Sequence, residues 1–272
     1  AGTFVLTVSL ILCMVFVPKK NALDTLQKRE TKAKETGKMT EEQLAKQKAN
    51  GSESDDTICT ADLTDDEILE GLNLLLIGDS IAVDVTDDFY EMFPNSVSDT
   101  KIGRITSLGK QVLDSYIDEK KWEGEGVIFA SLSNSPINGE LEDIREKIGK
   151  DMPLFLTTVR IPHDTFEEES NSKIKKFVEE NDHTYLIDWY AASEGHDEYF
   201  DADDTHLLPA GAKAYAKCIK EAVLAAYKKE NIEIPKSRLS SGADTSTDSS
   251  NASSTDSNTD SSNDNRTDTS TE

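Results

Sequence analysis

The chain has 272 residues, which is enough for one globular domain with further segments, and its net charge is −24. So large an acid excess argues against nucleic acid as the main partner, because phosphate binding requires basic patches. The three cysteines contain no Cys-x-x-Cys pair, so neither a zinc ribbon nor a thioredoxin-type site is indicated.

The chain opens with an uncharged apolar stretch. Residues 1–17 consist mostly of Leu, Val, Ile, Phe and Ala, close to the roughly 20 apolar residues that span a bilayer. A signal peptide is the alternative, but the stretch has neither a basic start nor a small-residue cleavage site. We therefore predict a transmembrane helix over residues 1–18, the last of an upstream membrane domain, with the rest of the chain outside the cell. The basic residues that follow, beginning with Lys19 and Lys20, favour the opposite orientation by the positive-inside rule, so the orientation stays open.

Two polar segments flank the central part of the chain. Residues 19–60 are rich in Lys, Glu, Gln, Ala and Thr, which predicts a charged stalk next to the membrane, either a solvated helix or a flexible spacer. Residues 236–272 are dominated by Ser, Thr, Asp and Asn. Because such a segment buries too little apolar surface to offset the entropy of ordering, we predict a disordered tail.

Residues 61–235 contain strand-like apolar runs that alternate with segments of helical period. The predicted strands are 72–78, 95–102, 126–132, 153–159 and 184–189. The predicted helices are 81–93, 107–122, 139–149, 166–181 and 208–229. This alternation predicts an α/β fold with a five-stranded parallel sheet and helices on both faces. In such sheets, binding and catalytic sites form beyond the carboxyl ends of the strands.

The first predicted strand ends in Gly78-Asp79-Ser80, which places a serine at the carboxyl edge of the sheet. There Ser80 would open the following helix, where backbone N–H groups and the helix dipole favour a developing negative charge. Serine is a weak nucleophile unless a base lies beside it. Taken alone, the tripeptide is more simply explained as a turn and helix cap, since Asp and Ser are common caps.

A second motif, Asp203-x-x-His206, stands just before the last predicted helix. An Asp three residues before a His can fold back so that its carboxylate accepts the imidazole Nδ1–H, which leaves Nε2 free to act as a base. Asp201 and Asp204 have less suitable spacings, and the other histidines lack this arrangement. Taken alone, the motif could equally be part of a solvated acidic loop.

Together, the two motifs resemble those of the SGNH/GDSL hydrolase superfamily. The resemblance implies a flavodoxin-like sheet, with Ser80 as nucleophile, His206 as general base and Asp203 as the carboxylate that orients it. It also implies an oxyanion hole. The donors would be the backbone N–H of Ser80, the N–H of Gly103 in "KIGRIT" and the side chain of Asn134 in "ASLSNSP".

The third block departs from the family pattern. The family has a glycine two residues before the asparagine, where this chain has Leu132. The missing glycine changes the backbone near the donor and leaves room for a decayed site. Asn138 is an alternative donor, and Asn134 could instead be a turn former at a strand end.

Three longer segments, 77–85, 101–106 and 188–216, are similar to the extracellular domain of OatA-type peptidoglycan O-acetyltransferases. In that family a membrane acyltransferase domain precedes a stalk and an SGNH domain, a layout matched here over roughly residues 1–230. The resemblance implies an enzyme at the cell membrane, with its catalytic domain outside. It would pass acetyl from a donor, through an acetyl-serine, to a cell-wall glycan acceptor, with the C6 hydroxyl of N-acetylmuramic acid as the expected position. No metal or cofactor is implied. A carbohydrate acetylesterase of the same fold and a non-catalytic wall-binding module stay open as alternatives.

Four other residues stand close to these motifs. Asp79 is expected to cap the helix or brace the loop around the serine. Arg104 could bind a glycan or donor group, or form a surface salt bridge. Trp189 and Tyr190 are expected at the core and its rim rather than as a platform for sugar, since burial is the usual place of aromatic residues.

Two cysteines, Cys59 just before the predicted domain and Cys218 in its last helix, could form a disulfide. That pairing depends on an extracellular location, because disulfides persist in oxidising compartments. It would pin the entry segment to the last helix.

Overall fold

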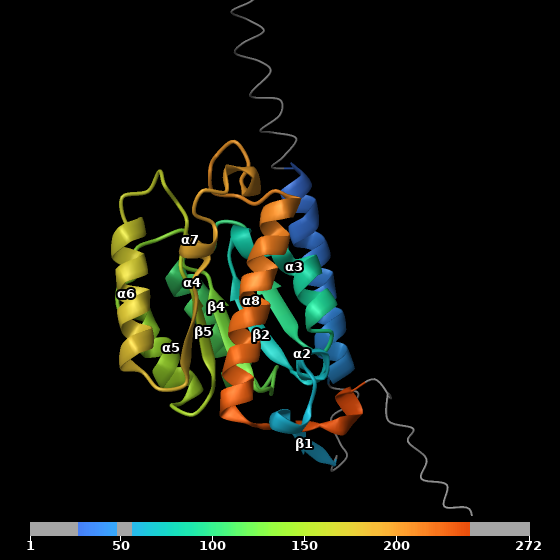
Figure 1. Cartoon of the computed structure of the whole chain (residues 1–272). Coiled ribbons are helices and arrows are strands. Elements are labelled where there is room, and N and C mark those ends of the chain that lie inside the picture. Colours follow the sequence, from blue (N-terminus) through green and yellow to red (C-terminus); the bar gives the residue numbers. More distant parts are fainter. Residues whose placement is uncertain (1–26, 48–55, 240–272) are drawn as a thin grey trace, which may run out of the picture. The chain divides into compact units, whose positions relative to one another are not determined.

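The computed structural model describes residues 27–47 and 56–239 (Figure 1). The predicted membrane helix over 1–18 and nearly all of the predicted tail over 236–272 lie outside these residues. Within the described ranges, every helix is too short or too polar to cross a membrane.

A parallel sheet forms the centre of the domain, as the alternating pattern predicts. Its five strands lie in the order β3-β2-β4-β5-β6, and all neighbours are parallel. The strands are β2 (Leu74–Gly78), β3 (Val97–Thr100), β4 (Gly126–Ala130), β5 (Leu154–Thr157) and β6 (Thr184–Ile187). Because β2 lies between β3 and β4, the chain changes direction across the sheet at β2, and this is where α/β sheets bind ligands.

Helices cover both faces of the sheet (Figure 1). They are α2 (Asp65–Gly71), α3 (Ser80–Met92), α4 (Thr106–Asp118), α5 (Glu140–Ile148), α6 (Glu167–Glu180), α7 (Trp189–Ala192) and α8 (Pro209–Glu230). α3 and α8 pack on one face, while α4, α5 and α6 pack on the other.

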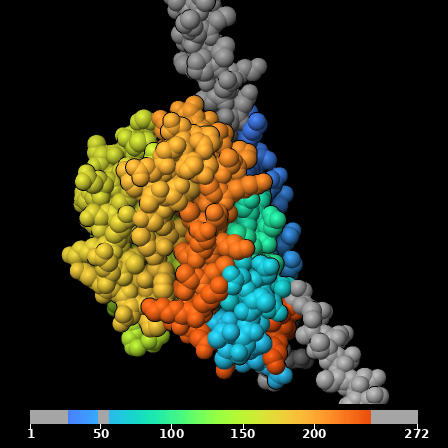
Figure 2. Space-filling model, viewed as in Figure 1, coloured from blue at the N-terminus to red at the C-terminus, as the bar shows by residue number. Residues whose placement is uncertain are grey.

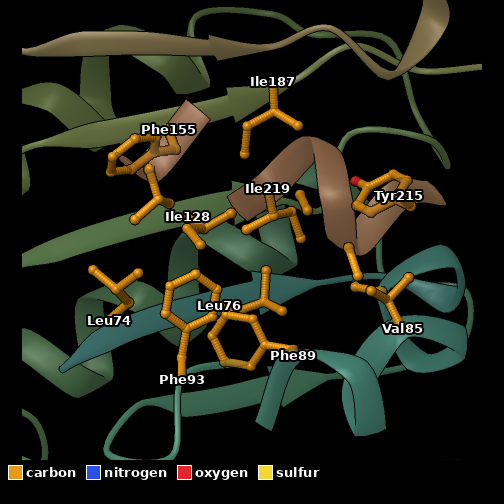
Figure 3. Packing of buried hydrophobic residues seen from close by; sticks show 14 of the residues in the cluster. Leu74, Leu76, Val85, Phe89, Phe93, Ile128, Phe155, Ile187, Tyr215 and Ile219 are labelled. Atoms are coloured by element: carbon orange, nitrogen blue, oxygen red, sulfur yellow. The ribbon is translucent and has the colours of Figure 1, made fainter. Parts of the chain in front are cut away.

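The core explains why the strands are continuous apolar runs. Successive side chains of a strand point to opposite faces, and both faces of this sheet are buried. Leu74 and Leu76 therefore pack toward α3 and α8, while Leu75 and Ile77 pack toward α4 and α5. Figure 3 shows the first of these layers, where the strand side chains meet Phe89 of α3, among others.

Several short elements lie outside the main sheet. β1 (Thr57–Cys59) pairs antiparallel with β7 (Glu233–Pro235), a two-stranded ribbon separate from the main sheet. Three turns of 3-10 helix complete the structure: Thr60–Asp62, Asp197–Tyr199 and Lys236–Arg238. Cys59 and Cys218 are both free thiols, so the structure does not contain the disulfide considered from the sequence.

The segment expected to be a solvated stalk or spacer contains a helix over residues 27–47 that packs on the domain (blue in Figures 1 and 2). The side chains that contact the domain recur at helical spacing. Thr40 Oγ1 donates to the carbonyl of Ser98 in β3, and Gln47 Nε2 donates to Asn73 Oδ1 at 2.9 Å. Since β3 is an edge strand, the helix lies where an uncovered edge would otherwise meet solvent.

Candidate active site

Ser80 lies where β2 passes into α3. Asp79 caps this helix, with its Oδ1 accepting from the N–H of Ile81 at 3.0 Å, and Ser80 is the first helical residue. Gly78 is required by close packing, because a Cβ at that position would lie 2.2 Å from the Cβ of Ala82. The serine therefore stands at the helix N-terminus, where the first N–H groups have no partner within the helix.

Asp79 also braces the neighbouring loop, which fulfils the role expected for it. Its Oδ2 accepts from the backbone N–H of Ser133 at 3.0 Å, so one carboxylate joins the nucleophile turn to the loop after β4. Burial of this carboxyl raises its pKa, and the hydrogen bonds from Ser133 and Ile81 oppose that effect.

The structure brings Ser80, His206 and Asp203 together. His206 Nε2 lies 3.0 Å from Ser80 Oγ, and His206 Nδ1 lies 2.7 Å from Asp203 Oδ2. Asp203 Oδ1 also accepts from the backbone N–H of His206 at 2.9 Å. Partial burial opposes ionisation of Asp203, but its hydrogen bonds with His206 outweigh burial and lower the pKa of the carboxyl. An ionised carboxylate at Nδ1 leaves Nε2 as the acceptor for the serine proton.

The other histidines and aspartates considered from the sequence do not join this group. His163 pairs with Asp204 at 3.2 Å, and His183 pairs with Glu230 at 2.8 Å. His196 lies 2.8 Å from Glu198. The carboxylate of Asp201 pairs with Arg29, a residue of the N-terminal helix.

Two loops that flank β2 carry the expected oxyanion donors. Gly78 is paired with Thr100 of β3 and with Ala130 of β4, so the loops after these strands begin level with the serine turn. Gly103 has a φ of +68°, a conformation that favours glycine, and its exposed N–H is unbonded within the described residues. Asn134 is also exposed, and its amide makes no hydrogen bond to the described part of the chain.

The loop after β4 is held at both neighbours of Asn134. Leu132 is fully buried in the core, and the next residue, Ser133, is held by Asp79. On the other side of Asn134, Ser135 Oγ accepts from the N–H of Thr106 at 3.1 Å. The asparagine is thus held from both sides, whereas the Asn138 amide bonds locally to the carbonyl of Pro136 at 3.3 Å.

Of the two roles considered for Arg104, the structure shows the salt bridge, but one that is buried rather than on the surface. Arg104 is 5 % exposed, and its guanidinium donates to the carbonyl of Gly78 at 3.0 Å and to Asp99 Oδ1 at 2.6 Å. Arg104, the residue after Gly103, thereby joins the end of β2 to the end of β3. Trp189 is buried and Tyr190 is 38 % exposed, which confirms the core and rim positions expected for them.

Sequence reasoning missed Asp84. This buried residue accepts the backbone N–H of Leu207, next to His206, at 3.1 Å through its Oδ2. Burial raises the pKa of Asp84, and the nearby Arg29 charge is the largest opposing influence. The available signal was spacing, since Asp84 stands four residues after Ser80 and so shares its face of the helix.

A sizeable cleft lies next to the site in the described part of the chain. A cavity of about 830 Å³ adjoins Gly103 and is lined by the helix over 27–47, the end of β3 and α4. Its lining includes Leu108, which is 46 % exposed, and polar residues such as Gln111. No group of three or more His, Cys, Asp or Glu side chains within 27–47 and 56–239 could hold a metal ion.

Comparison with known proteins agrees with this arrangement. No family model matches the chain. Over 146 residues the chain is 34 % identical to the O-acetyltransferase OatA of Staphylococcus aureus (strain NCTC 8325 / PS 47). The matched region covers 53 % of this chain and 24 % of that protein. The chain therefore spans about a quarter of the length of the curated relatives it matches.

A solved structure matches the fold. The C-terminal catalytic domain of the peptidoglycan O-acetyltransferase OatA of Streptococcus pneumoniae, solved with a methylsulfonyl adduct, superposes with a TM-score of 0.53 at 20 % identity. The match covers 61 % of this chain and 99 % of that domain. The chain thus has the SGNH/GDSL hydrolase fold and is homologous, over about half of its length, to the OatA O-acetyltransferases.

Proposed function

We propose that this chain contains the catalytic domain of an O-acetyltransferase that moves an acetyl group through acetyl-Ser80 to a cell-wall glycan, at the C6 hydroxyl of N-acetylmuramic acid. The observation that carries the proposal is the contact chain from Ser80 Oγ to His206 at 3.0 Å and from His206 to Asp203 at 2.7 Å. Similarity to the OatA proteins, one of which is described as a peptidoglycan O-acetyltransferase, supports peptidoglycan as the acceptor.

The first half-reaction acylates the enzyme. As Ser80 Oγ attacks the carbonyl carbon of the acetyl donor, His206 Nε2 takes the hydroxyl proton and the carbonyl electrons move to oxygen. The backbone N–H groups of Ser80 and Gly103 and the amide of Asn134 donate to that oxyanion, each worth about 3 kcal/mol in the transition state. Collapse breaks the donor's ester bond, and the leaving oxygen takes the proton from His206.

The second half-reaction reverses these roles. The glycan hydroxyl attacks acetyl-Ser80 while His206 removes its proton, and collapse returns that proton to Ser80 Oγ as the sugar ester departs. We place the glycan in the cleft beside Gly103, whose size suits a ligand of a few sugar units. Water at the same position would give acetate, which is the reaction of an esterase.

Location follows from the same resemblance. We place the domain on the outer side of the cell membrane.

The test follows two products at once. The chain is incubated with p-nitrophenyl acetate, with and without a muropeptide acceptor, and both free acetate and acetylated sugar are quantified by mass spectrometry. We expect acetylated sugar that is lost in Ser80→Ala and kept in Ser107→Ala, a serine of α4 outside the contact chain. Acetate alone, unaffected by the acceptor, would indicate an esterase, and neither product would indicate a wall-binding module.

A further inference from the structure

Arg29, on the helix over residues 27–47, is a buried cation. Its Nε lies 3.6 Å from Asp84 Oδ1 and its NH2 group lies 3.2 Å from Asp201 Oδ2. The side chains of Arg29 and Asp84 are each only 10 % exposed. Charges withdrawn from water in this way must be paired, and here one guanidinium faces carboxylates from two separate parts of the chain.

Both partners of Arg29 support the loop over residues 201–207, which carries Asp203 and His206: Asp84 through its carboxylate and Asp201 through its backbone. At the end of the loop, Asp84 Oδ2 accepts the N–H of Leu207 at 3.1 Å. At its start, the N–H of Asp201 donates to the carbonyl of His206 at 2.8 Å. The guanidinium of Arg29 thus contacts Asp84 and Asp201, the two residues that hold the ends of the His206 loop.

The loop needs a cation because it is strongly acidic. Three aspartates fall within residues 201–204, and Asp84 adds a fourth carboxylate beside them. Lys32, the neighbouring cation on the same helix, directs its ammonium instead to the backbone carbonyl of Asp84 at 2.7 Å and to Asp87 at 3.3 Å. The role of bridging Asp84 and Asp201 falls to Arg29.

We propose that Arg29 is a positioning residue for the acyl-transfer reaction: it bridges Asp84 and Asp201 and so holds the loop of Asp203 and His206 against Ser80. This role rests on the proposed function. The helix over 27–47 is then part of the catalytic unit rather than a spacer. Arginine suits the position, because its planar guanidinium presents separate N–H groups to the two carboxylates in a fixed fork, whereas lysine offers one compact ammonium on a flexible stem.

The helix has other contacts with the domain, so we expect it to stay docked when Arg29 is replaced. Gln43 Nε2 donates to the carbonyl of Pro94 at 2.9 Å, and Thr40 and Gln47 form the contacts described above. Lys28 provides a matched control, because it is the adjacent residue, is exposed and forms no ion pair with the described part of the chain.

The experiment uses the whole chain and its Arg29→Ala, Arg29→Lys and Lys28→Ala variants. For each, the rate constant for sulfonylation of Ser80 by methanesulfonyl fluoride is measured by mass spectrometry, together with kcat and KM for p-nitrophenyl acetate. In Arg29→Ala we expect the sulfonylation rate and kcat to fall about tenfold or more, with KM within roughly twofold of its original value, because a misplaced base slows chemistry more than binding. Arg29→Lys should be intermediate and Lys28→Ala unchanged.

The outcomes separate three cases. Equal sulfonylation rate constants in Arg29→Ala and the unaltered chain would overturn the proposal. It would also be overturned if a smaller fraction of the Arg29→Ala chains reacted, but those that did reacted with an unchanged rate constant. If Arg29→Ala does not fold, Asp201→Asn removes one arm of the bridge at a partly exposed residue and should still slow sulfonylation severalfold. An unaltered chain whose Ser80 does not react would overturn the proposed function, and this role with it.

Discussion

In the proposed reaction, the reactivity of Ser80 depends on single residues, because His206 must present one free ring nitrogen to accept the serine proton. Asp203 holds Nδ1 at 2.7 Å and also accepts the backbone N–H of His206, so one carboxylate fixes both the tautomer and the loop turn. The hydrogen bonds that lower the pKa of Asp203 keep it ionised at neutral pH.

Asp203→Asn should therefore lower kcat/KM for p-nitrophenyl acetate by roughly 10³–10⁴-fold and leave a trace of activity, because an amide favours the wrong tautomer. Asp204→Asn is the matched control, since it makes the same charge change one residue away and its partner is His163. A rate for Asp203→Asn within error of that for Asp204→Asn would contradict the assignment.

Asp79 gives a pH-dependent prediction. Its pKa is raised by burial, so it contributes stability that is present below the ordinary aspartate value of about 3.9 and is lost as pH rises through the folded-state pKa. Asn cannot ionise, so Asp79→Asn should gain stability relative to the unaltered chain between pH 4 and pH 8. Urea unfolding at the two pH values measures this, and a difference that is constant with pH would show that Asp79 does not titrate in this range.

At the scale of elements, the site is assembled from the ends of neighbouring strands. β2 delivers Ser80, and the loops after β3 and β4 deliver Gly103 and Asn134 from either side. The buried side chains of Asp79 and Arg104 fasten these loops to one another. The two proposed donors are therefore exposed and unpaired within the described residues, while their backbones are held.

Gly103→Ala tests one of these donors. At a φ of +68° an alanine is strained, so the turn should relax and withdraw its N–H from the oxyanion. We expect kcat to fall about tenfold or more. Gly149→Ala is also strained, at a φ of +83°, but it stands at the C-terminal end of α5 and should cost only stability. Thermal unfolding and kcat, measured on both variants, separate the two effects, and equal kcat values would remove Gly103 from the oxyanion hole.

At the scale of the whole molecule, the sequence predicts elements with a periodic apolar pattern and contacts between residues that are close in the chain. The run from Leu74 to Ile77 predicts a strand buried on both faces, and the spacing of Asp203 and His206 predicts their contact. A helix was one of the two alternatives for the segment over 27–47, but its docking on the domain was not predicted. Its contact face is mostly polar, with Arg29, Thr36, Thr40 and two glutamines beside the partly buried Met39 and Leu44, so the apolar periodicity is weak. The ribbon of β1 and β7 was missed for another reason, since it joins three-residue strands from opposite ends of the domain.

Sequence analysis also did not predict the long-range polar contacts. Arg104 and Asp99 are close in sequence, but nothing local indicates that the guanidinium is buried against the end of β2. Likewise, the bridge from Arg29 to Asp201 joins residues 172 positions apart. In a chain of net charge −24, these buried arginines pair with the chain's own carboxylates, which composition alone does not indicate.

The most direct test of the whole account is the lifetime of an acetyl group on Ser80. The chain is mixed with p-nitrophenyl acetate, quenched with acid at intervals and digested, and the peptide that contains Ser80 is followed by mass spectrometry with and without a muropeptide. The account predicts acetyl on Ser80 that decays faster when the muropeptide is present, while acetylated sugar accumulates. Acetylated sugar formed without any acetyl on Ser80 would contradict it. So would an acetyl-Ser80 that decays at the same rate with and without the muropeptide.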